Sequence, residues 1–380
     1  MTFHEVTIGD YFDVKHGYAF KGEYFTDAGP YIVLTPGNFF ESGGFRFREG
    51  KEKFYVGEFP ESFLLEKDDL IIAMTQQGPG LLGSSAMVPE DNQFLHNQRI
   101  GLVTNLDESK LCKRFLYYLL NTRPVRGQIE GSATGSKVKH TAPKRIKAVR
   151  VEIPSFKKQE RIAEVLTAHD EFIENNRRRI AFLEEAAEQV YKEWFVRFRF
   201  PGNESTTRKD GIPSGWRKET LGVIAPFLYG KALKASDRVE GEFQVYGSSG
   251  VVGTHASRLV DGPGIIIGRK GNVGSVFWEC KPFWPIDTVY FVEPSQVDLF
   301  IYYSLRALEF ISSDVAVPGL NRNHAHRVAI LVPTPKVKDA FVNISQPIHD
   351  QINNLHQQNA RLSEARNLLL PRLMSGEIQV

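Results

Sequence analysis

The chain has 380 residues, of which 42% are hydrophobic and 12% aromatic, and its formal net charge is +2. This length predicts two or three domains with hydrophobic cores, and the composition argues against intrinsic disorder. The charge is too small for a protein that coats nucleic acid by electrostatics alone, so DNA contacts would depend on local basic patches or on a partner. Cys112 and Cys280 lie far apart with no CxxC pair, which argues for a reducing compartment and against a disulfide scaffold or a zinc module.

Residues 1–153 are predicted to form a first β-rich domain. Short apolar runs between glycine and proline signals indicate strands at 31–35, 69–74, 100–104 and 146–153 and a short helix at 111–121. GPGLLG (78–83) matches GxGxxG, but the SSAMVPEDN that follows contains a proline and no helical period. We interpret GPGLLG as a turn and not as a dinucleotide site.

A long helix is predicted within residues 154–200. Spacings of four and three residues alternate there over several heptads, which is the pattern of a coiled-coil seam. The seam positions are Ile162, Leu166, His169, Ile173, Asn176, Ile180, Leu183, Ala187, Val190 and Trp194. At about 1.5 Å per residue, such a helix is roughly 50 Å long.

Residues 201–332 are predicted to form a linker, at 201–214, and a second β-rich domain. Strands are indicated at 264–268, 274–277 and 288–292, and a short helix at 297–312. The Gly-rich run at 262–275 lacks the spacing of a phosphate loop and is interpreted as strand, turn, strand. TIGDYFDVKHG, which ends at Gly17, resembles TLGVIAPFLYG, which ends at Gly230. We therefore expect the two domains to be related by internal duplication.

The C-terminal segment, residues 333–380, repeats the heptad helix. Pro333 lies 179 residues after Pro154 (333 − 154), and the same offset places Leu362 on Leu183. The second seam comprises Phe341, Ser345, Ile348, Ile352, Leu355, Asn359, Leu362, Arg366, Leu369 and Leu373. Two such stripes in one chain predict that the helices pack against each other. The alternative is that each helix packs only on its own domain.

Four residues of the helices carry further expectations. Asn176 and Asn359 fall on the seams, where a buried amide can fix the register of a helix pair. Pro347 and Pro371 are expected to kink or shorten the second helix at its ends.

Several functional classes find no support in the sequence. There is no HExxH, no GxSxG and no Asn-Pro-Pro-aromatic motif, and His324 and His326 lack neighbours at metal-ligand spacing. No segment reaches the roughly 18 apolar residues of a membrane span, and no basic N-terminal region precedes an apolar run. We therefore predict no catalytic, cofactor or metal site, no membrane contact and a cytoplasmic location.

Polar and basic side chains gather in three loop segments of each predicted domain. Arg, Asn and Gln can form paired hydrogen bonds with a base edge, and Lys and backbone amides anchor phosphates. The candidate DNA-contact residues of the first domain are Thr75, Gln76, Gln77, Asn97, Gln98, Arg99, Lys137 and Lys139. Those of the second domain are Tyr246, Ser248, Ser249, Arg269, Lys270, Asn272, Asn321, Arg322, Asn323 and His324. The alternative interpretation of each segment is a solvated turn.

Two such domains on a helical spacer predict a particular kind of DNA target. Domains held apart by a rigid rod would contact two sites separated by about one DNA turn, roughly 34–36 Å. Because the domains differ in length and sequence, the two half-sites are expected to differ. The expected target is split and non-palindromic.

The order of domain, heptad helix, domain, heptad helix resembles the specificity subunit of Type I restriction–modification enzymes. KEWFVRFRFPG (192–202) is similar to the end of that family's central helix, GIPSGWRKETLG (211–222) to the entry of its second recognition domain, and LLLPRLMSGEI (368–378) to its C-terminus. VYGSSGVVG, IIIGRKGNVGSV, FWPIDTVYFV and PGLNRN resemble one recurring class of that recognition domain. HGYAFKGEYF and FLHNQRIG of the first domain fit the family less tightly.

The resemblance implies an α+β fold with two β-rich target recognition domains, separated by two long helices that form an antiparallel coiled coil. It implies a non-catalytic subunit that reads a bipartite, asymmetric site in double-stranded DNA and docks two methyltransferase (modification) subunits. Restriction subunits with translocase activity would join that complex. S-adenosylmethionine and ATP are expected on these partners, and no cofactor on this chain. The coiled-coil and partner positions are Ile173, Asn176, Ile180, Leu183, Ile352, Leu355, Asn359 and Leu362.

Three other functions stay open at this point. The first is a stand-alone DNA-binding or regulatory protein built from the same domains without methylation partners. The second is an enzyme that acts through the loop around Arg269 and Asn272. The third is a structural adaptor in which both domains bind protein.

Overall fold

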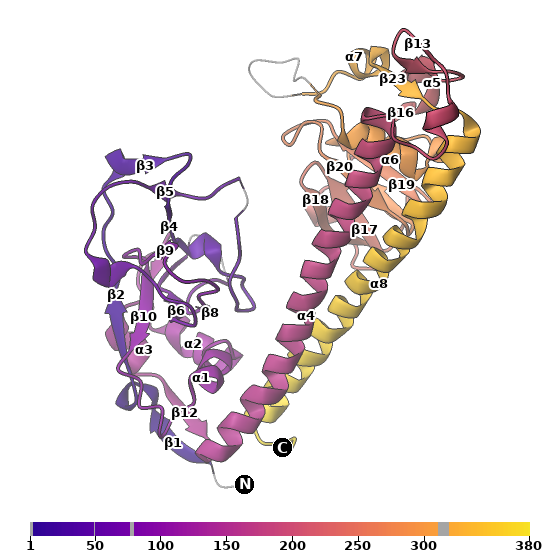
Figure 1. Cartoon of the computed structure of the whole chain (residues 1–380). Helices are drawn as coiled ribbons and strands as arrows, with labels where there is room; N and C mark the ends of the chain where they lie inside the picture. The colour runs from indigo at the N-terminus through magenta and orange to yellow at the C-terminus, as the bar shows by residue number, and fades with distance from the viewer. Residues whose placement is uncertain (1–2, 49, 77–79, 311–318) are drawn as a thin grey trace. The chain divides into compact units, whose positions relative to one another are not determined.

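The computed structural model describes residues 3–48, 50–76, 80–310 and 319–380 (Figure 1). The chain forms two compact units, the first of Met1–Asn175 with Gln358–Val380 and the second of Asn176–Gln357. Each unit contains one β-rich domain and a stretch of both long helices, α4 (Phe156–Tyr191) and α8 (Pro335–Met374). The predicted α+β class, with strand-rich regions and two long helices, is confirmed.

The first unit is built on two 4-stranded sheets. The central sheet is antiparallel, in the order β2 (Asp13–His16), β10 (Ile100–Thr104), β6 (Leu70–Ala73) and β8 (Ser85–Met87). The other sheet has the order β3 (Phe25–Thr26), β5 (Phe54–Tyr55), β4 (Tyr31–Val33) and β9 (Phe94–Leu95). Short ladders join β1 (His4–Thr7) to β12 (Arg150–Ile153) and β7 (Thr75–Gln76) to β11 (Lys139–His140). The domain's helices are α1 (Lys113–Leu120), α2 (Arg123–Gly131) and α3 (Pro143–Lys147).

The second unit has a central 4-stranded sheet and a 3-stranded sheet. The central order is β16 (Phe227–Tyr229), β22 (Val289–Val292), β19 (Gly264–Gly268) and β20 (Val276–Glu279). The smaller sheet has the order β18 (Gly250–His255), β17 (Phe243–Gly247) and β21 (Phe283–Pro285). Ladders join β15 (Arg217–Thr220) to β23 (Ala329–Val332) and β13 (Arg208–Lys209) to β14 (Ile212–Pro213). The domain's helices are α5 (Leu221–Ile224), α6 (Leu299–Arg306) and α7 (Arg322–Arg327).

The central sheets of the two domains share one topology. The strand order β2-β10-β6-β8 recurs as β16-β22-β19-β20, and the ladder β1–β12 recurs as β15–β23. Equivalent backbone hydrogen bonds join Ile8 N to Val149 O at 3.0 Å and Leu221 N to Val328 O at 2.9 Å. The internal duplication expected from the sequence is therefore present down to single hydrogen bonds.

The aligned glycines Gly17 and Gly230 occupy the same place in the two domains. A Cβ atom on Gly17 would lie 2.0 Å from the carbonyl oxygen of Asn97, and one on Gly230 would lie 2.1 Å from that of Ile286. No side chain fits so close to a backbone carbonyl, so this approach of two chain segments requires glycine.

The central strands are apolar on both faces because both faces are covered. In β6, Leu70 and Ile72 point into one core cluster while Ile71 and Ala73 point into another. In β19, Ile265 and Ile267 belong to one cluster and Ile266 to a second. Successive side chains of a strand alternate between its faces, so an unbroken apolar run marks a strand that is buried twice.

The predicted heptad seams are confirmed, since every seam position is buried or half-buried. Within the first unit, Arg366 and Asp170 are 2.5 Å apart, and Asn359 Nδ2 donates to Ile173 O at 3.4 Å. Later residues of α4 therefore contact earlier residues of α8. The helices are antiparallel in this unit.

The same antiparallel pairing holds within the second unit. Ile180 packs with Ile352 and Leu355 in a small apolar cluster that also includes Leu183. Further along α4, the ring of Tyr191 lies 6.0 Å from that of Phe341.

Each helix stretch also packs on the domain of its own unit. In the first unit, Tyr118 of α1 donates its hydroxyl proton to Asp170 of α4 at 2.7 Å. In the second unit, Tyr191 donates to Ser304 of α6 at 3.1 Å, and Arg306 pairs with Glu188 at 3.3 Å. The two packing arrangements that the sequence left as alternatives therefore coexist.

Several local predictions were wrong, each for an identifiable reason. Residues 146–147 end α3, a helix that begins at Pro143, and the strand starts only at Arg150. Pro143 occupies the first helical turn, where the missing N–H costs nothing. The strand expected at 274–277 begins at Val276 because Gly271 and Gly274 adopt positive φ angles of 81° and 79° in the preceding turn.

The helices differ from the prediction in three further places. α8 continues from Pro335 to Met374 past both internal prolines, so neither Pro347 nor Pro371 ends it. The helix expected at 297–312 stops at Arg306, and residues 311–312 lie outside the described residues. α2 was not predicted, because Gly127 and Gly131 weaken its helical signal. The expected linker at 201–214 also contains the short ladder β13–β14.

None of the helices in the described ranges combines the length and the apolar character of a membrane span.

Candidate nucleic-acid interface

The three polar loop segments predicted in the second domain lie together. Leu320 N donates to Arg269 O at 2.8 Å, which joins the segment after β19 to the segment before α7. Ser275 Oγ donates to Ser248 O at 2.7 Å, which ties the turn between β17 and β18 to the same place. We call this set, residues 248–249, 269–272 and 319–324, the second junction.

Two arginines and a tyrosine form the charged centre of the second junction. The guanidinium carbons of Arg269 and Arg322 lie 5.0 and 4.8 Å from the ring centre of Tyr229. Tyr229 is 49% exposed, so both cations gather on one surface ring. Cation–π contacts of this kind hold a planar guanidinium in a defined place. The cluster is suited to an electronegative ligand such as a phosphate or the acceptor edge of a base.

A buried tyrosine supports this cluster from below. The hydroxyl of Tyr290 donates to Leu320 O at 2.9 Å, and the Arg269 guanidinium carbon lies 5.7 Å from the Tyr290 ring. Burial raises the pKa of Tyr290, so its hydroxyl stays protonated and keeps donating. Tyr229 was not predicted as a site residue. The signal available in the sequence was its position directly before the duplicated Gly230.

The other predicted residues of the second unit divide by exposure. Tyr246 is buried and donates to Glu279 Oε2 at 2.8 Å, so its polar group serves the fold. Asn321 caps α7 by accepting from His324 N at 3.1 Å. Ser248 is half-buried, and its carbonyl is held by Ser275. The exposed side chains are Ser249, Lys270, Asn272, Asn321, Asn323 and His324.

The predicted segments of the first domain also lie together. Gln76 and Thr75 of β7 pair with Lys139 and His140 of β11. Met74, directly before β7, contacts both remaining parts of the set. Its N donates to Arg99 O at 3.0 Å, and its O accepts from Thr141 N at 2.9 Å. We call this set, residues 74–76, 97–99 and 137–141, the first junction.

The first junction is only partly available to a ligand. Gln76 is buried, and its Oε1 accepts from Leu81 N at 2.9 Å and Leu82 N at 2.7 Å. Gln76 therefore holds the turn that follows it, and we do not propose it as a DNA contact. Lys139 is paired with Glu130 at 2.8 Å.

The other predicted residues of the first junction lie closer to solvent. Asn97 is half-buried and accepts from Arg99 N at 3.0 Å. Thr75 is half-buried, and Gln98, Arg99 and Lys137 are exposed. Gln77 lies outside the described residues.

The two junctions are equivalent in backbone and different in side chain. The bridge between Lys270 and Gly319 matches the pairing of Thr75 with His140. In this register, Arg269 is equivalent to Met74 and Arg322 to Pro143. The aligned glycines make Tyr229 equivalent to His16. The arginine–tyrosine cluster is therefore present only in the second junction.

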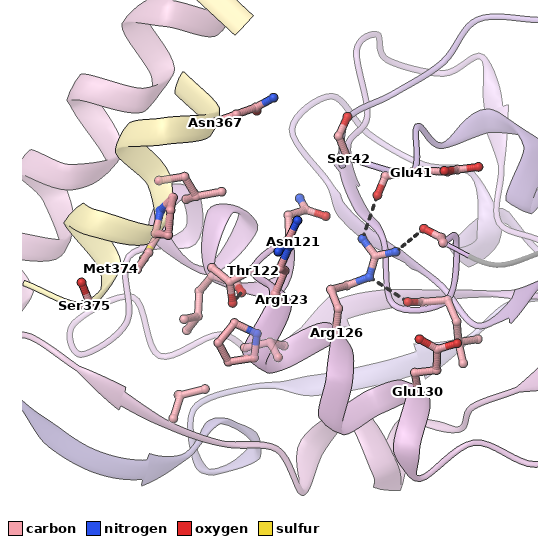
Figure 2. A pocket seen from close by; sticks show the side chains of 18 of the residues that line it. Glu41, Ser42, Asn121, Thr122, Arg123, Arg126, Glu130, Asn367, Met374 and Ser375 are labelled. Carbon is pink, nitrogen blue, oxygen red and sulfur yellow. Dashed lines mark hydrogen bonds between the residues drawn. The ribbon is translucent and has the colours of Figure 1, made fainter. Parts of the chain in front are cut away.

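A cavity of 1320 Å³ lies elsewhere in the first unit, lined by residues of α1, α2, the β1–β12 ladder and the end of α8 (Figure 2). Arg126 stands in its wall and donates to the backbone oxygens of Leu82 at 2.8 Å, Glu41 at 3.1 Å and Gly80 at 2.5 Å. Burial lowers the pKa of Arg126. Its donors are used to hold the turn around Gly80, which is a structural role. Across the described ranges, no three or more His, Cys, Asp and Glu side chains are grouped as metal ligands would be.

Comparison with known proteins agrees with this architecture. The family described as Type I restriction modification DNA specificity domain matches residues 2–185. The specificity subunit of the Type I restriction enzyme MjaIX from Methanocaldococcus jannaschii is 25% identical over 323 residues, which cover 76% of this chain and 74% of that protein. The specificity subunit of the enzyme HindI from Haemophilus influenzae is 21% identical over 320 residues, covering 61% of this chain and 70% of that protein.

A solved structure shares the fold of the whole chain. The S subunit of a Type I restriction-modification system from M. genitalium has a TM-score of 0.59 and 20% identity, and the match covers 98% of this chain and 96% of that one. The duplicated domains, the two long helices and the sequence matches agree: residues 2–185 match the Type I restriction modification DNA specificity domain, and the chain is similar to specificity subunits of Type I restriction enzymes along most of its length.

Proposed function

We propose that this chain reads a bipartite, asymmetric site in double-stranded DNA, one half with each junction. The observation that carries the proposal is the recurrence of one three-segment junction in both units, with different side chains on it. A recognition subunit of this family does not catalyse, so sequence selection is the task left to its domains. Two equivalent scaffolds with different side chains would select two different half-sites.

The exposed side chains of the junctions suit a DNA surface. Exposed Arg99 and Gln98 in the first junction, and exposed Asn272 and half-buried Arg322 in the second, can form paired hydrogen bonds with base edges. Lys137 and Lys270 are exposed cations that can contact phosphates. The small net charge of +2 implies that much of the phosphate contact would come from partner subunits.

We further propose that two modification subunits dock on the paired helices and supply S-adenosylmethionine, while restriction subunits supply ATP-driven chemistry. Two aromatic side chains of α4 support the docking, since Phe172 is 60% and Phe182 is 70% exposed. Exposed aromatic side chains are typical anchors of protein interfaces. Their solvation is unfavourable in the isolated chain, which a partner would relieve.

Mapping of methylated adenines tests the proposed function. The chain is co-expressed with the modification subunit of a Type I system from the same host, and methylated positions are read across the genome. A split motif with two unlike halves is the expected result. A palindromic motif, methyl transfer by the purified chain alone, or a stable chain that binds DNA but no modification subunit would contradict the proposal, and the last result would favour the stand-alone DNA-binding protein.

The docking surface has its own test. Phe172→Ala and Phe182→Ala remove exposed rings, so the chain should keep its melting temperature while the affinity for the modification subunit falls tenfold or more. Phe47→Ala is the matched control, because Phe47 is 55% exposed and its ring neighbours are Phe45 and Phe94 of the first domain. Equal affinity of all three variants for the modification subunit would exclude α4 as the docking surface.

A further inference from the structure

We propose that Arg322 reads a guanine in the half-site of the second junction and that Arg269 positions it, an inference that rests on the proposed function. The two arginines have the same charge and share the ring of Tyr229. Their hydrogen bonds differ, and that difference assigns them different tasks.

Arg269 is committed to its own domain. Its Nη1 donates to Asp287 O at 3.0 Å, and its guanidinium contacts both Tyr229 and Tyr290. Its backbone oxygen accepts from Leu320 N, two residues before Arg322. Arg269 therefore fixes the place of the Tyr229 ring and of the segment that carries Arg322.

Arg322 has no such commitment among the residues that the structure describes. Its guanidinium contacts the Tyr229 ring at 4.8 Å, but it makes no hydrogen bond or ion pair there, and its buried Nε has no acceptor. A half-buried arginine held by a ring but without acceptors is prepared for an acceptor that arrives with a ligand. The terminal nitrogens present a planar pair of donors.

Guanine is the base that fits this pair of donors. Its N7 and O6 are two adjacent acceptors in the major groove, and arginine contacts both at once. A phosphate would also accept from arginine, but exposed Lys270 beside the cluster can supply that contact. The equivalent position in the first junction is Pro143, which has no donor, so this reading is confined to one half-site.

The test uses the assembled complex of this chain with modification subunits and DNA duplexes that carry the mapped site. Each guanine of the site is replaced in turn by 7-deazaguanine, which removes the N7 acceptor and keeps base pairing. Arg322→Gln removes the cation, and Arg258→Gln is the matched control. Like Arg322, Arg258 contacts an aromatic ring, since it lies 5.8 Å from the ring of Phe243, but it is paired with Asp261 and lies outside the second junction.

We expect one guanine in one half-site at which 7-deazaguanine weakens wild-type binding about fivefold or more. Arg322→Gln should lose roughly tenfold or more of the preference for guanine at that position and should be insensitive to 7-deazaguanine there. The other half-site should be read as before, and Arg258→Gln should behave as wild type. The wild-type measurement needs no variant, so it stands even if Arg322→Gln fails to fold.

Other outcomes overturn the inference. A half-site without a guanine sensitive to 7-deazaguanine excludes this reading. Equal weakening of Arg322→Gln on all sequences, with a smaller dependence on salt, would make Arg322 a phosphate contact. Failure of the wild-type complex to select any split site would instead refute the proposed function itself, so the two failures are distinguishable.

Discussion

Two histidines, one in each unit, are kept neutral by burial. The ring Nε2 of His96 lies 2.8 Å from Ile100 O, and burial lowers the pKa of His96 to about 4. Because the backbone oxygen can only accept, Nε2 carries the proton and Nδ1 is left as a buried atom without a partner. His349 Nε2 lies 2.7 Å from the Tyr303 hydroxyl, and burial, followed by the charge of Arg306, lowers the pKa of His349 to about 4.

These histidines predict a loss of stability in mild acid. Between pH 6.5 and about 4 the unfolded chain protonates His96 and the folded chain does not, so the free energy of unfolding falls as the pH falls. The full effect of His96 is about 3 kcal/mol, from about 1.36 kcal/mol for each unit of pKa difference. Denaturant unfolding at several pH values measures it. His96→Leu should flatten the pH dependence, while His356→Gln, at an exposed position, should not. Parallel curves for His96→Leu and wild type would contradict this.

The duplicated glycines predict a second effect of single residues. Gly17→Ala and Gly230→Ala each place a Cβ about 2 Å from a backbone carbonyl, so the segments must separate. We expect each variant to lose several kcal/mol of folding stability or to fail to fold, roughly the upper end of single-residue effects. Gly127→Ala is the control, because nothing lies within 4 Å of its Cβ and it sits inside α2. It should gain up to about 1 kcal/mol. Thermal melting compares the three variants, and equal melting temperatures would refute the close approach.

At the scale of elements, the long helices combine an apolar seam with a few polar contacts. Ile352 and Leu355 are buried against α4 in the second unit, and Ile162, Leu166 and Leu373 share one core cluster in the first. The first unit adds the Asp170–Arg366 pair and a hydrogen bond from Asn359. Asp170 also accepts from Tyr118, so one carboxylate links α1, α4 and α8. Polar groups of this kind restrict which turns of the two helices can face each other.

Two leucines of α8 differ in exposure, since one lies on the seam and the other on the surface. Leu355 is 0% exposed and Leu368 is 61% exposed on the same helix. Leu355→Ala should reduce the free energy of unfolding by about 2–5 kcal/mol because it leaves a cavity between the helices. Leu368→Ala should change it by less than about 0.5 kcal/mol. Denaturant unfolding of both variants checks this. A small effect of Leu355→Ala would mean that the helix pair does not hold the second unit together.

At the scale of the whole molecule, the chain repeats one domain and varies the side chains of its junction. The hydrogen bonds that build the junctions recur, while Arg269, Arg322 and Tyr229 stand where the first domain has Met74, Pro143 and His16. On the proposed function, shared backbone geometry with exchanged side chains would let each half change its specificity without altering the scaffold.

Independent junctions predict additive effects on DNA selection. Arg99→Ala should weaken discrimination at one half-site, and Arg322→Ala at the other, by about 1–3 kcal/mol each. Because each junction is built from residues of its own unit, the double variant should lose the sum. Competition binding with duplexes mutated in one half at a time measures both effects. A loss of discrimination at both half-sites in either single variant would contradict the assignment of one half-site to each junction.

The sequence alone determined the architecture of this protein because its signals are periodic and repeated. The seam from Ile162 to Trp194 and its copy at an offset of 179 residues predicted two long helices, and the strand β10 was predicted with its observed bounds. Local exceptions such as α2 and the uninterrupted α8 were missed, since packing there overrides the propensities of glycine and proline.

Only the tertiary structure decided which polar residues belong to a site. In the sequence, Gln76 and Asn97 resemble Asn272 and Gln98, because all four are amide residues in polar loop segments. Gln76, however, is buried beneath the turn that it holds. Arg269 and Arg322 lie 53 residues apart (322 − 269) and meet at Tyr229, which was not predicted as a site residue. Exposure and partnership depend on long-range contacts, which spacing along the chain does not encode. They separate Arg269, which is bonded to its own domain, from Arg322, whose buried Nε has no acceptor among the described residues.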